Sequence, residues 1–249
     1  MILRTLYVGF AVENIDRTRR SLQRVLGLPS DRLDPDPFLG TDRGARVPLP
    51  NECWLYLMES RQPDSPVARF IQRRGPGLER LAFQSDDIQG ELARVRQAGV
   101  PLGPDAVADT PSGWRFVVPP EHVCGITVEV VQPKPGQWVC TAPANIGGVL
   151  ALQHVGTANL SLEATVQALE QLFDLHPGPV VFQNHRSFKP GNECHWIDVA
   201  QGAVGKGDRT AQFLEEKGEG LEHIALEVAD IRAAARRVLL AGARIDENK

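Results

Sequence analysis

The chain has 249 residues, of which 42% are hydrophobic and 23% are charged, and its formal net charge is −4 at pH 7. This length accommodates one large globular domain or two of ordinary size. The small negative charge excludes the basic surface that binds a phosphate backbone, so we expect no nucleic-acid partner. No apolar run approaches the ~20 residues that span a bilayer, so we expect no membrane association.

The N-terminal segment, Met1 to Val12, is apolar and passes directly into Glu13 without a small-residue cleavage site. It therefore predicts a first β-strand rather than a signal peptide. The four cysteines are Cys53, Cys124, Cys140 and Cys194. Because they show neither CxxC spacing nor the density of a disulfide scaffold, we expect free thiols and a cytoplasmic location.

Four segments carry apolar residues at helical spacing, and each is expected to turn that stripe toward the core. They begin at Asn14, Asp87, Ser161 and Asp230. Ser161 and Asp230 are candidate N-caps, because their side chains can accept hydrogen bonds from the first free backbone amides of a helix. The fourth helix is expected to bury Ile231, Ala235 and Val238.

Short β-type runs follow these helices. They are Cys53–Met58, Arg115–Val118, Gly125–Val131, Val180–Phe182 and His195–Val199. A strand, then a helix, then several strands, repeated along the chain, predicts an α+β architecture.

The two halves of the chain repeat each other in order. Residues 7–12, YVGFAV, recur as HVGTAN at 154–159, and residues 70–82, FIQRRGPGLERLA, recur as FLEEKGEGLEHIA at 213–225. Residues 51–56, NECWLY, recur at 192–198 as NECHWID, with one residue inserted before the tryptophan. Internal repeats of this kind indicate a duplication.

The repeat predicts a first domain at residues 1–133, a linker at 134–149 rich in proline and glycine, and a second domain at 150–249. The sequence ends before counterparts of the strands that contain Arg115 and Glu129. We therefore expect the last structural module to be incomplete. Strand edges left open in this way favour pairing with a second copy, so a homodimer is one expected state.

The repeated motifs, together with Pro119-Pro-Glu-His-Val-Cys-Gly and the strand after it, resemble the vicinal oxygen chelate superfamily. This superfamily includes glyoxalase I, methylmalonyl-CoA epimerase, extradiol dioxygenases and 4-hydroxyphenylpyruvate dioxygenase. The resemblance implies four βαβββ modules, paired into two open-barrel domains. Each barrel would cup a divalent metal, with ligands from the first and last strands of its modules.

In the first half, the ligand positions that the resemblance implies hold residues unsuited to a metal. They are Tyr7, Tyr56, Arg80 and Glu129. An arginine cation does not coordinate a metal, and a single carboxylate does not make a site. The first domain is therefore expected to bind no metal, and Arg80 marks either an anion-binding pocket or a buried salt bridge.

In the second half, the same positions hold His154, Asp198 and His223. Two imidazoles and a carboxylate suit Fe(II), which is the favoured cofactor, while Zn, Mn, Co or Ni are alternatives. Strand alternation lets either Asp198 or His195 face the barrel interior, but not both, and the tryptophan alignment favours Asp198. A fourth position, a glutamate in the family, has no counterpart in the sequence.

The remaining histidines, His122, His176 and His185, are expected to be loop residues without a catalytic role. His185 with Arg186 and Lys189 is either a solvated loop or a basic rim for an anionic substrate. No residue is assigned as the general acid or base.

The resemblance implies a metal-dependent enzyme for a small oxygenated substrate that chelates the metal through two neighbouring oxygens. A first half without metal-ligating residues, followed by a second half that has them, favours a ring-cleaving or keto-acid dioxygenase. The local motifs favour instead an epimerase, isomerase or lyase, like methylmalonyl-CoA epimerase or glyoxalase I. The third reading is a non-catalytic binding protein of the bleomycin-resistance type.

Overall fold

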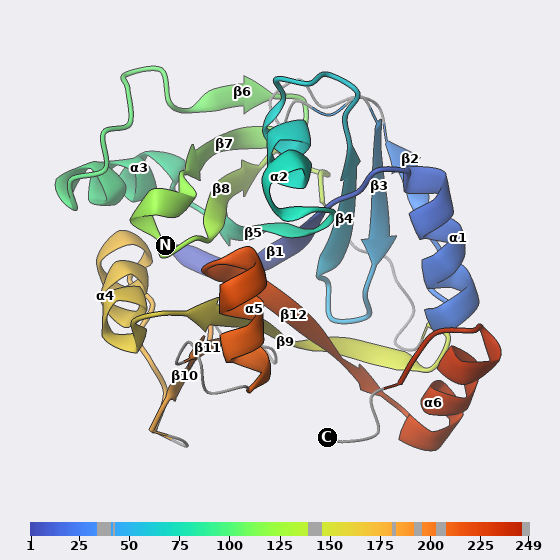
Figure 1. Cartoon of the computed structure of the whole chain (residues 1–249). Helices are drawn as coiled ribbons and strands as arrows, with labels where there is room; N and C mark the ends of the chain where they lie inside the picture. Colours follow the sequence, from blue (N-terminus) through green and yellow to red (C-terminus); the bar gives the residue numbers. More distant parts are fainter. Residues whose placement is uncertain are drawn as a thin grey trace. The chain divides into compact units, whose positions relative to one another are not determined.

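The computed structural model describes residues 1–33, 41, 43–138, 146–180, 183–191, 196–202 and 208–245. In these residues the chain has a mixed α+β fold whose strands lie in two sheets (Figure 1). The predicted α+β class is therefore confirmed. None of the described helices is both long and apolar enough to cross a lipid bilayer.

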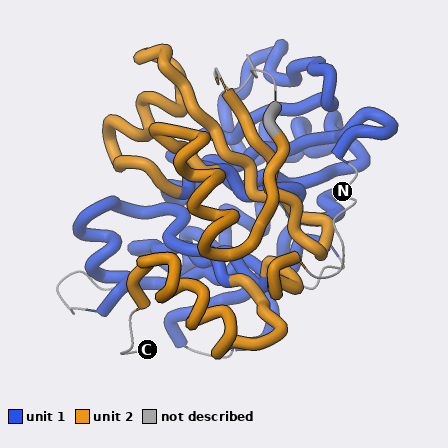
Figure 2. Tube along the Cα trace, turned by 90° about the vertical axis from the view of Figure 1, so that its right-hand side faces the viewer, with its two compact units in different colours: residues 1–9, 78–139, 153–225 blue, residues 10–77, 140–152, 226–249 orange. Residues whose placement is uncertain are grey.

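The chain divides into two compact units (Figure 2). The first consists of residues 1–9, 78–139 and 153–225, and the second of residues 10–77, 140–152 and 226–249. Each unit thus combines segments from both sequence halves. The division of the sequence into domains at 1–133 and 150–249 stays a prediction.

The larger sheet contributes five strands to the first unit, in the order β1-β5-β8-β7-β6. These strands are β1 (Ile2–Ala11), β5 (Gly77–Ser85), β6 (Ala108–Thr110), β7 (Gly113–Val118) and β8 (Thr127–Pro133). The helix α3 (Ile88–Gln97) packs on β7 and β8. Strands β5 and β8 are parallel and place Ala82 opposite Glu129, so Arg80 and Glu129 lie on the same face.

The smaller sheet has the order β10-β11-β9-β12. Its strands are β9 (Val149–Asn159), β10 (His185–Phe188), β11 (Trp196–Gln201) and β12 (Gly220–Val228). In the first unit, α4 (Leu162–Phe173) packs on β10 and β11, and α5 (Arg209–Lys217) precedes β12. Strand β11 runs parallel to β9, and β10 runs antiparallel to β11.

The second unit contains the antiparallel strands β2-β3-β4 and three helices. These elements are α1 (Ile15–Leu26), β2 (Asp31–Leu33), β3 (Arg43–Pro48), β4 (Trp54–Glu59), α2 (Pro66–Arg74) and α6 (Ile231–Leu240). Helix α1 packs on β3 and β4, where the buried Glu59 accepts a hydrogen bond of 2.7 Å from the backbone amide of Ile15.

The predicted helix starts are confirmed by their caps. Asn14, Asp87, Ser161 and Asp230 each accept hydrogen bonds from backbone amides in the first turn of the helix that follows. These contacts satisfy amides that have no partner within the helix. Cys53 and Cys124 are free cysteines, as expected, whereas Cys140 and Cys194 lie outside the described residues.

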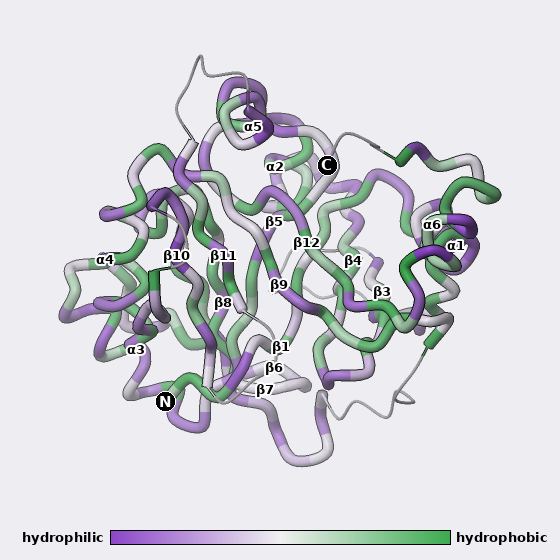
Figure 3. Tube along the Cα trace, turned by 90° about the horizontal axis from the view of Figure 1, so that it is seen from below, coloured by the Kyte–Doolittle hydropathy of each residue, from purple (hydrophilic) through white to green (hydrophobic). Residues whose placement is uncertain are grey.

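The predicted burial of the fourth helix is wrong. Ile231 of α6 is 72% exposed, although its repeat counterpart Ile88 of α3 is 4% exposed. Hydrophobic residues recur along α6 (Figure 3), but none of them is buried. The physical reason is the absence, among the described residues, of strands after α6 equivalent to β7 and β8, which cover α3.

The predicted strand at Val180–Phe182 is also not observed. Val180 lies outside any strand and is 62% exposed, and residues 181 and 182 lie outside the described part of the chain. The strand at this point of the chain is β10, which begins at His185. Three of its four residues are polar, so it carried no apolar alternation to mark it.

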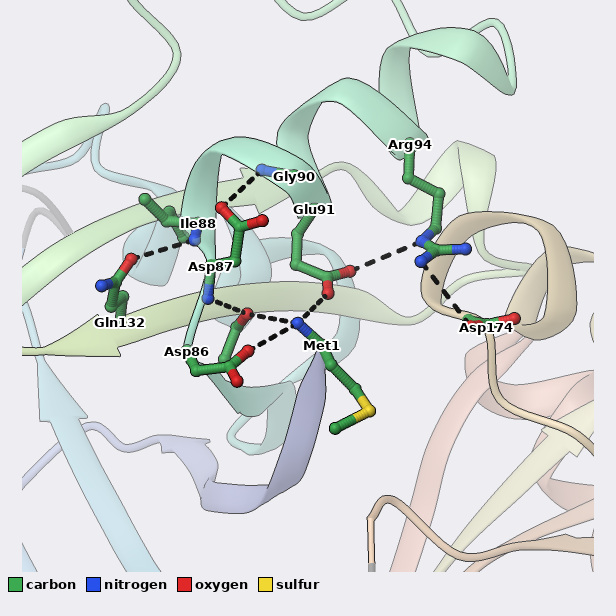
Figure 4. Close-up of polar contacts among 10 residues, drawn as sticks. Met1, Asp86, Asp87, Ile88, Gly90, Glu91, Arg94, Gln132 and Asp174 are labelled. Atoms are coloured by element: carbon green, nitrogen blue, oxygen red, sulfur yellow. Dashed lines mark hydrogen bonds and ion pairs between the residues drawn. The ribbon is translucent and has the colours of Figure 1, made fainter.

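A chain of ion pairs joins the start of β1 to α3 and α4 in the first unit (Figure 4). The ammonium group of Met1 lies 2.7 Å from Asp86 Oδ1 and 3.0 Å from Glu91 Oε1. Glu91 Oε2 lies 3.7 Å from Arg94 Nε, whose Nη2 lies 3.6 Å from Asp174 at the end of α4. Burial lowers the pKa of the Met1 amine, but the two carboxylates outweigh this effect and raise it overall.

Candidate metal centre

The register of the smaller sheet gathers the predicted site residues on one face. Trp196 lies opposite His154, and Asp198 lies opposite Gly156 on the parallel strand β9. Because side chains alternate between the faces of a sheet, residues two apart on a strand share a face. Asp198 therefore lies on the same face as His154. His195, the alternative to Asp198, lies outside the described residues.

His154 and His223 are brought together by strands β9 and β12. Their Nε2 atoms lie 3.0 Å apart, and their rings meet edge to face with centroids separated by 5.2 Å. The ring of His154 also stacks on Trp196, at 5.9 Å between centroids. Two residues separated by most of the second half thus point their outer ring nitrogens at one another.

Gly156 provides the space for the His223 ring. A Cβ atom at position 156 would lie 2.2 Å from Cε1 and 2.6 Å from Nε2 of His223, which is inside the contact distance of these atoms. A side chain at this position would displace the imidazole. The glycine of the HVG motif therefore has a geometric role in the site.

The other ring nitrogen of each histidine faces an oxygen of the preceding residue. Nδ1 of His154 contacts Oε1 of Gln153, and Nδ1 of His223 lies 3.7 Å from Oε2 of Glu222. An oxygen beside Nδ1 favours the tautomer that carries the proton on that nitrogen. The two Nε2 atoms face each other at hydrogen-bond distance, and the tautomers decide which of them donates.

This arrangement fits a divalent metal ion. With metal–nitrogen bonds of about 2.0–2.1 Å, two imidazole nitrogens in adjacent positions on one ion lie about 2.9–3.4 Å apart. The observed separation of 3.0 Å lies in this range.

Asp198 lies near the histidine pair without joining it in a cluster. Its Oδ1 accepts a hydrogen bond of 3.3 Å from the hydroxyl of Ser187 on β10. Among the described residues, no group of three His, Cys, Asp or Glu side chains is close enough to hold a metal together. The structure therefore brings His154 and His223 together and leaves Asp198 on the wall beside them.

A cavity of about 400 Å³ opens beside His154. Its lining residues are Gln153, His154, Pro179, Asn184, His185, Ser187, Trp196 and Asp198. A volume in this range accommodates a small organic molecule. Asp198 and His154 thus share one cavity.

His185 was expected in a loop, either solvated or in a basic rim for an anionic substrate. It is not a loop residue but the first residue of β10, where it pairs with Ala200 and lines the cavity. His122 lies in a short 3₁₀ helix, and His176 lies in a loop, where its side chain is 71% exposed.

The environment of His154 favours the neutral imidazole. Burial lowers the pKa of His154, the nearby ring of His223 lowers it further, and the charge of Asp198 partly offsets both effects. A neutral imidazole has the lone pair that a metal requires.

Comparison with known proteins identifies the family of the first half. The model of the "Glyoxalase/Bleomycin resistance protein/Dioxygenase superfamily" matches residues 7–118. Residues 7–118 belong to this superfamily. The resemblance stated from the sequence is therefore confirmed.

Solved structures and one curated protein resemble different shares of the chain. A variant of 4-hydroxymandelate synthase from Streptomyces coelicolor is 22% identical, has a TM-score of 0.73, and matches 97% of this chain and 75% of its own. Methylmalonyl-CoA epimerase from Mycobacterium tuberculosis is 25% identical, with a TM-score of 0.50, over 54% of this chain and 90% of its own. An uncharacterized protein, YqjC, from Bacillus subtilis (strain 168) is 26% identical over 53% of this chain and 93% of its own length.

A buried ion-pair network occupies the first half of the sequence, at the positions that correspond to His154 and His223. Glu129 Oε2 accepts a short hydrogen bond from the hydroxyl of Tyr7 and one of 3.1 Å from Nη1 of Arg80. Nη1 of Arg115 lies 3.5 Å from the other oxygen of Glu129, and Nε of Arg80 donates to Glu79. Arg80 thus belongs to a buried salt bridge, one of the two alternatives left open by the sequence.

The buried charges of this network raise the pKa values of Arg80 and Tyr7. Burial lowers the pKa of Arg80, but Glu79, Tyr7 and Glu129 outweigh it and raise the value overall. Burial and the charge of Glu129 raise the pKa of Tyr7 well above its usual value. Tyr56 is buried in the second unit.

Proposed function

We propose that this protein is a metal-dependent enzyme that acts on a small oxygenated organic molecule. The observation that carries the proposal is the pair of imidazole nitrogens, His154 Nε2 and His223 Nε2, which face each other at 3.0 Å. The cavity beside His154 supplies room for a substrate next to this pair.

His154 and His223 would hold the metal, and Asp198 would supply the third ligand. A set of two histidines and one carboxylate favours Fe(II), with Zn, Mn, Co or Ni as alternatives. When bound, the ion supplies Lewis acidity toward two neighbouring substrate oxygens.

The chain's own residues orient the substrate and exclude water. Trp196 gives the cavity a flat apolar wall, and His185, Ser187 and Asn184 offer hydrogen-bonding groups along the rest of its lining. Ser187 holds Asp198 through its hydroxyl and so limits the rotamers of the carboxylate. A small number of polar groups in an otherwise apolar wall fixes the orientation of a ligand.

Of the reactions in the superfamily, we favour a dioxygenase acting on an aromatic or keto-acid substrate. The fold likeness to 4-hydroxymandelate synthase extends over 97% of this chain and supports a similar arrangement of the two sequence halves. An epimerase or isomerase is the alternative, supported by the likeness of about half the chain to methylmalonyl-CoA epimerase. A non-catalytic binding protein is supported by a different observation, the separation of Asp198 from the histidine pair.

Metal content tests the proposal. Protein purified without chelator or nickel affinity resin is analysed by inductively coupled plasma mass spectrometry, before and after reconstitution with Fe(II) or Zn(II). We expect about one ion per chain in the unaltered protein and its loss in His154→Ala/His223→Ala. The matched control, His122→Ala/His176→Ala, removes two histidines outside the site and should keep the metal. Well-folded protein that holds no metal after reconstitution would refute an enzyme and leave the binding protein.

The reaction class is tested separately on the loaded protein. Oxygen consumption with aromatic keto acids or catechols as probes supports the dioxygenase. Exchange of substrate protons with deuterium from solvent, without oxygen consumption, supports the epimerase instead.

A further inference from the structure

The residue before each histidine of the pair faces the inner nitrogen of that histidine. Gln153 contacts Nδ1 of His154, and Glu222 lies 3.7 Å from Nδ1 of His223. Nδ1 of His223 is buried, and no described residue lies within hydrogen-bond distance of it. A buried ring nitrogen beside a carboxylate at this distance is a donor whose acceptor is already in place.

Glu222 is a fixed acceptor rather than a mobile one. Its side chain is 4% exposed, although it carries a charge, and Nε of Arg209 on α5 lies 2.9 Å from its Oε1. The ion pair is made by Oε1, and the other carboxylate oxygen, Oε2, lies 3.7 Å from Nδ1 of His223. A carboxylate oxygen accepts a hydrogen bond more strongly than a neutral oxygen does.

The same relation recurs in the first half of the chain. Glu79 corresponds to Glu222 in the repeat, and it contacts its own neighbour, Arg80, through Nε at 2.5 Å. Each half therefore has a buried glutamate directly before the repeated position, which is Arg80 in the first half and His223 in the second. This parallel makes the approach of Glu222 to His223 a property of the motif.

We infer that Glu222 is a positioning residue, which holds His223 with Nδ1 protonated and Nε2 directed at the metal, and that Arg209 holds Glu222. This inference rests on the proposed metal site. Carboxylates that orient a ligand histidine in this way fix its tautomer and raise its basicity. Gln153 orients His154 in the same way, but its amide oxygen is neutral. The two ligand histidines are therefore expected to differ in basicity.

The test compares metal affinity and imidazole tautomers in the full chain. Co(II) and Zn(II) affinities are measured by competition with a chromophoric chelator for the unaltered protein, Glu222→Ala, Glu222→Gln and Arg209→Met. Glu227→Ala, an exposed glutamate on the same strand, is the matched control. We expect about 10–100-fold weaker binding in Glu222→Ala, an intermediate loss in Glu222→Gln, whose amide oxygen still accepts a hydrogen bond, and no change in the control.

The spectroscopic readout separates positioning from general stability. In the Zn(II)-loaded protein, ¹⁵N NMR should show His223 with a protonated Nδ1, and Co(II) absorption should change in Glu222→Ala but not in Glu227→Ala. Unchanged affinity and spectra in Glu222→Ala, with metal bound by the unaltered protein, would overturn this inference and leave the metal site standing. Absence of metal binding by the unaltered protein would overturn both.

Discussion

Replacing Arg80 by methionine should destabilise the first unit strongly. The substitution keeps most of the side-chain volume and removes the guanidinium, which contacts Glu129 at 3.1 Å and Glu79 at 2.5 Å. Glu129 is fully buried, so the carboxylate cannot recover water as a partner.

The magnitude follows from the geometry. At an effective dielectric constant of about 20, a charge pair at 3.1 Å interacts by about 5 kcal/mol. Removal of one partner from a buried pair costs about 3–5 kcal/mol, because the other charge stays buried. Arg115, 3.5 Å from Glu129, remains as a second cation. We therefore expect a loss near the lower end, about 3 kcal/mol, out of a total stability of about 5–15 kcal/mol.

Chemical denaturation of four proteins measures this effect. They are the unaltered chain, Arg80→Met, the neutralised double variant Arg80→Met/Glu129→Gln, and Arg69→Met as a control at an exposed position. The double variant should recover at least 1 kcal/mol of the loss, since coupled pairs depart from additivity by about 0.5–3 kcal/mol. A loss below about 1 kcal/mol in Arg80→Met, similar to that of the control, would refute the view that this ion pair organises the first half.

Three further outcomes are expected. Gly156→Ala should weaken Zn(II) binding about 10–100-fold, because the added Cβ displaces the His223 ring. The control Gly178→Ala, whose added Cβ meets only Ser187 O at 3.5 Å, should leave the affinity unchanged. Equal affinities in the two variants would exclude the steric role of Gly156. Asp198→Ala should lower metal affinity by about 100-fold or more if Asp198 is the third ligand, as measured by chelator competition, and an unchanged affinity would remove it from the site. Because the pKa of Tyr7 is raised in the folded chain, the stability contributed by its neutral form is complete below about pH 10 and is lost as the pH rises toward the folded value. The free energy of unfolding should therefore fall more steeply above pH 10 in the unaltered protein than in Tyr7→Phe, and parallel curves would contradict this assignment.

The features predicted correctly from the sequence are those that depend on local residues or on the repeat. Helix starts at Asn14 and Ser161 were predicted because a cap needs only a side-chain oxygen and the next turn of backbone. The approach of His154 to His223 followed from their equivalent places in the repeat and the resemblance to a barrel fold. The alignment of the tryptophans placed Asp198 on the face of His154, and the strand register agrees.

The features that the sequence did not reveal depend on contacts between distant segments. Strand β10 exists because His185–Phe188 pairs with β11, not because its own residues favour a strand. Its polar pattern therefore concealed the position of His185 in the cavity. The exposure of α6 was missed for the opposite reason, since its apolar spacing is that of a buried helix but no described strand covers it.

Equivalent positions in the two halves obtain a positive charge in two different ways. At Tyr7, Arg80 and Glu129, the positive charge belongs to the chain itself, because the guanidinium groups of Arg80 and Arg115 lie 3.1 Å and 3.5 Å from the buried carboxylate of Glu129. At His154 and His223, two imidazoles face each other at 3.0 Å, and in the proposed metal site the positive charge comes from the bound ion. We therefore expect that the side chains at these two positions decide whether the centre binds a metal ion or contains an arginine in its place. The double variant Tyr7→His/Arg80→His, which keeps Glu129, should therefore bind Zn(II) in the first half of the chain. A folded variant that binds no Zn(II) would show that the two halves differ in more than these residues.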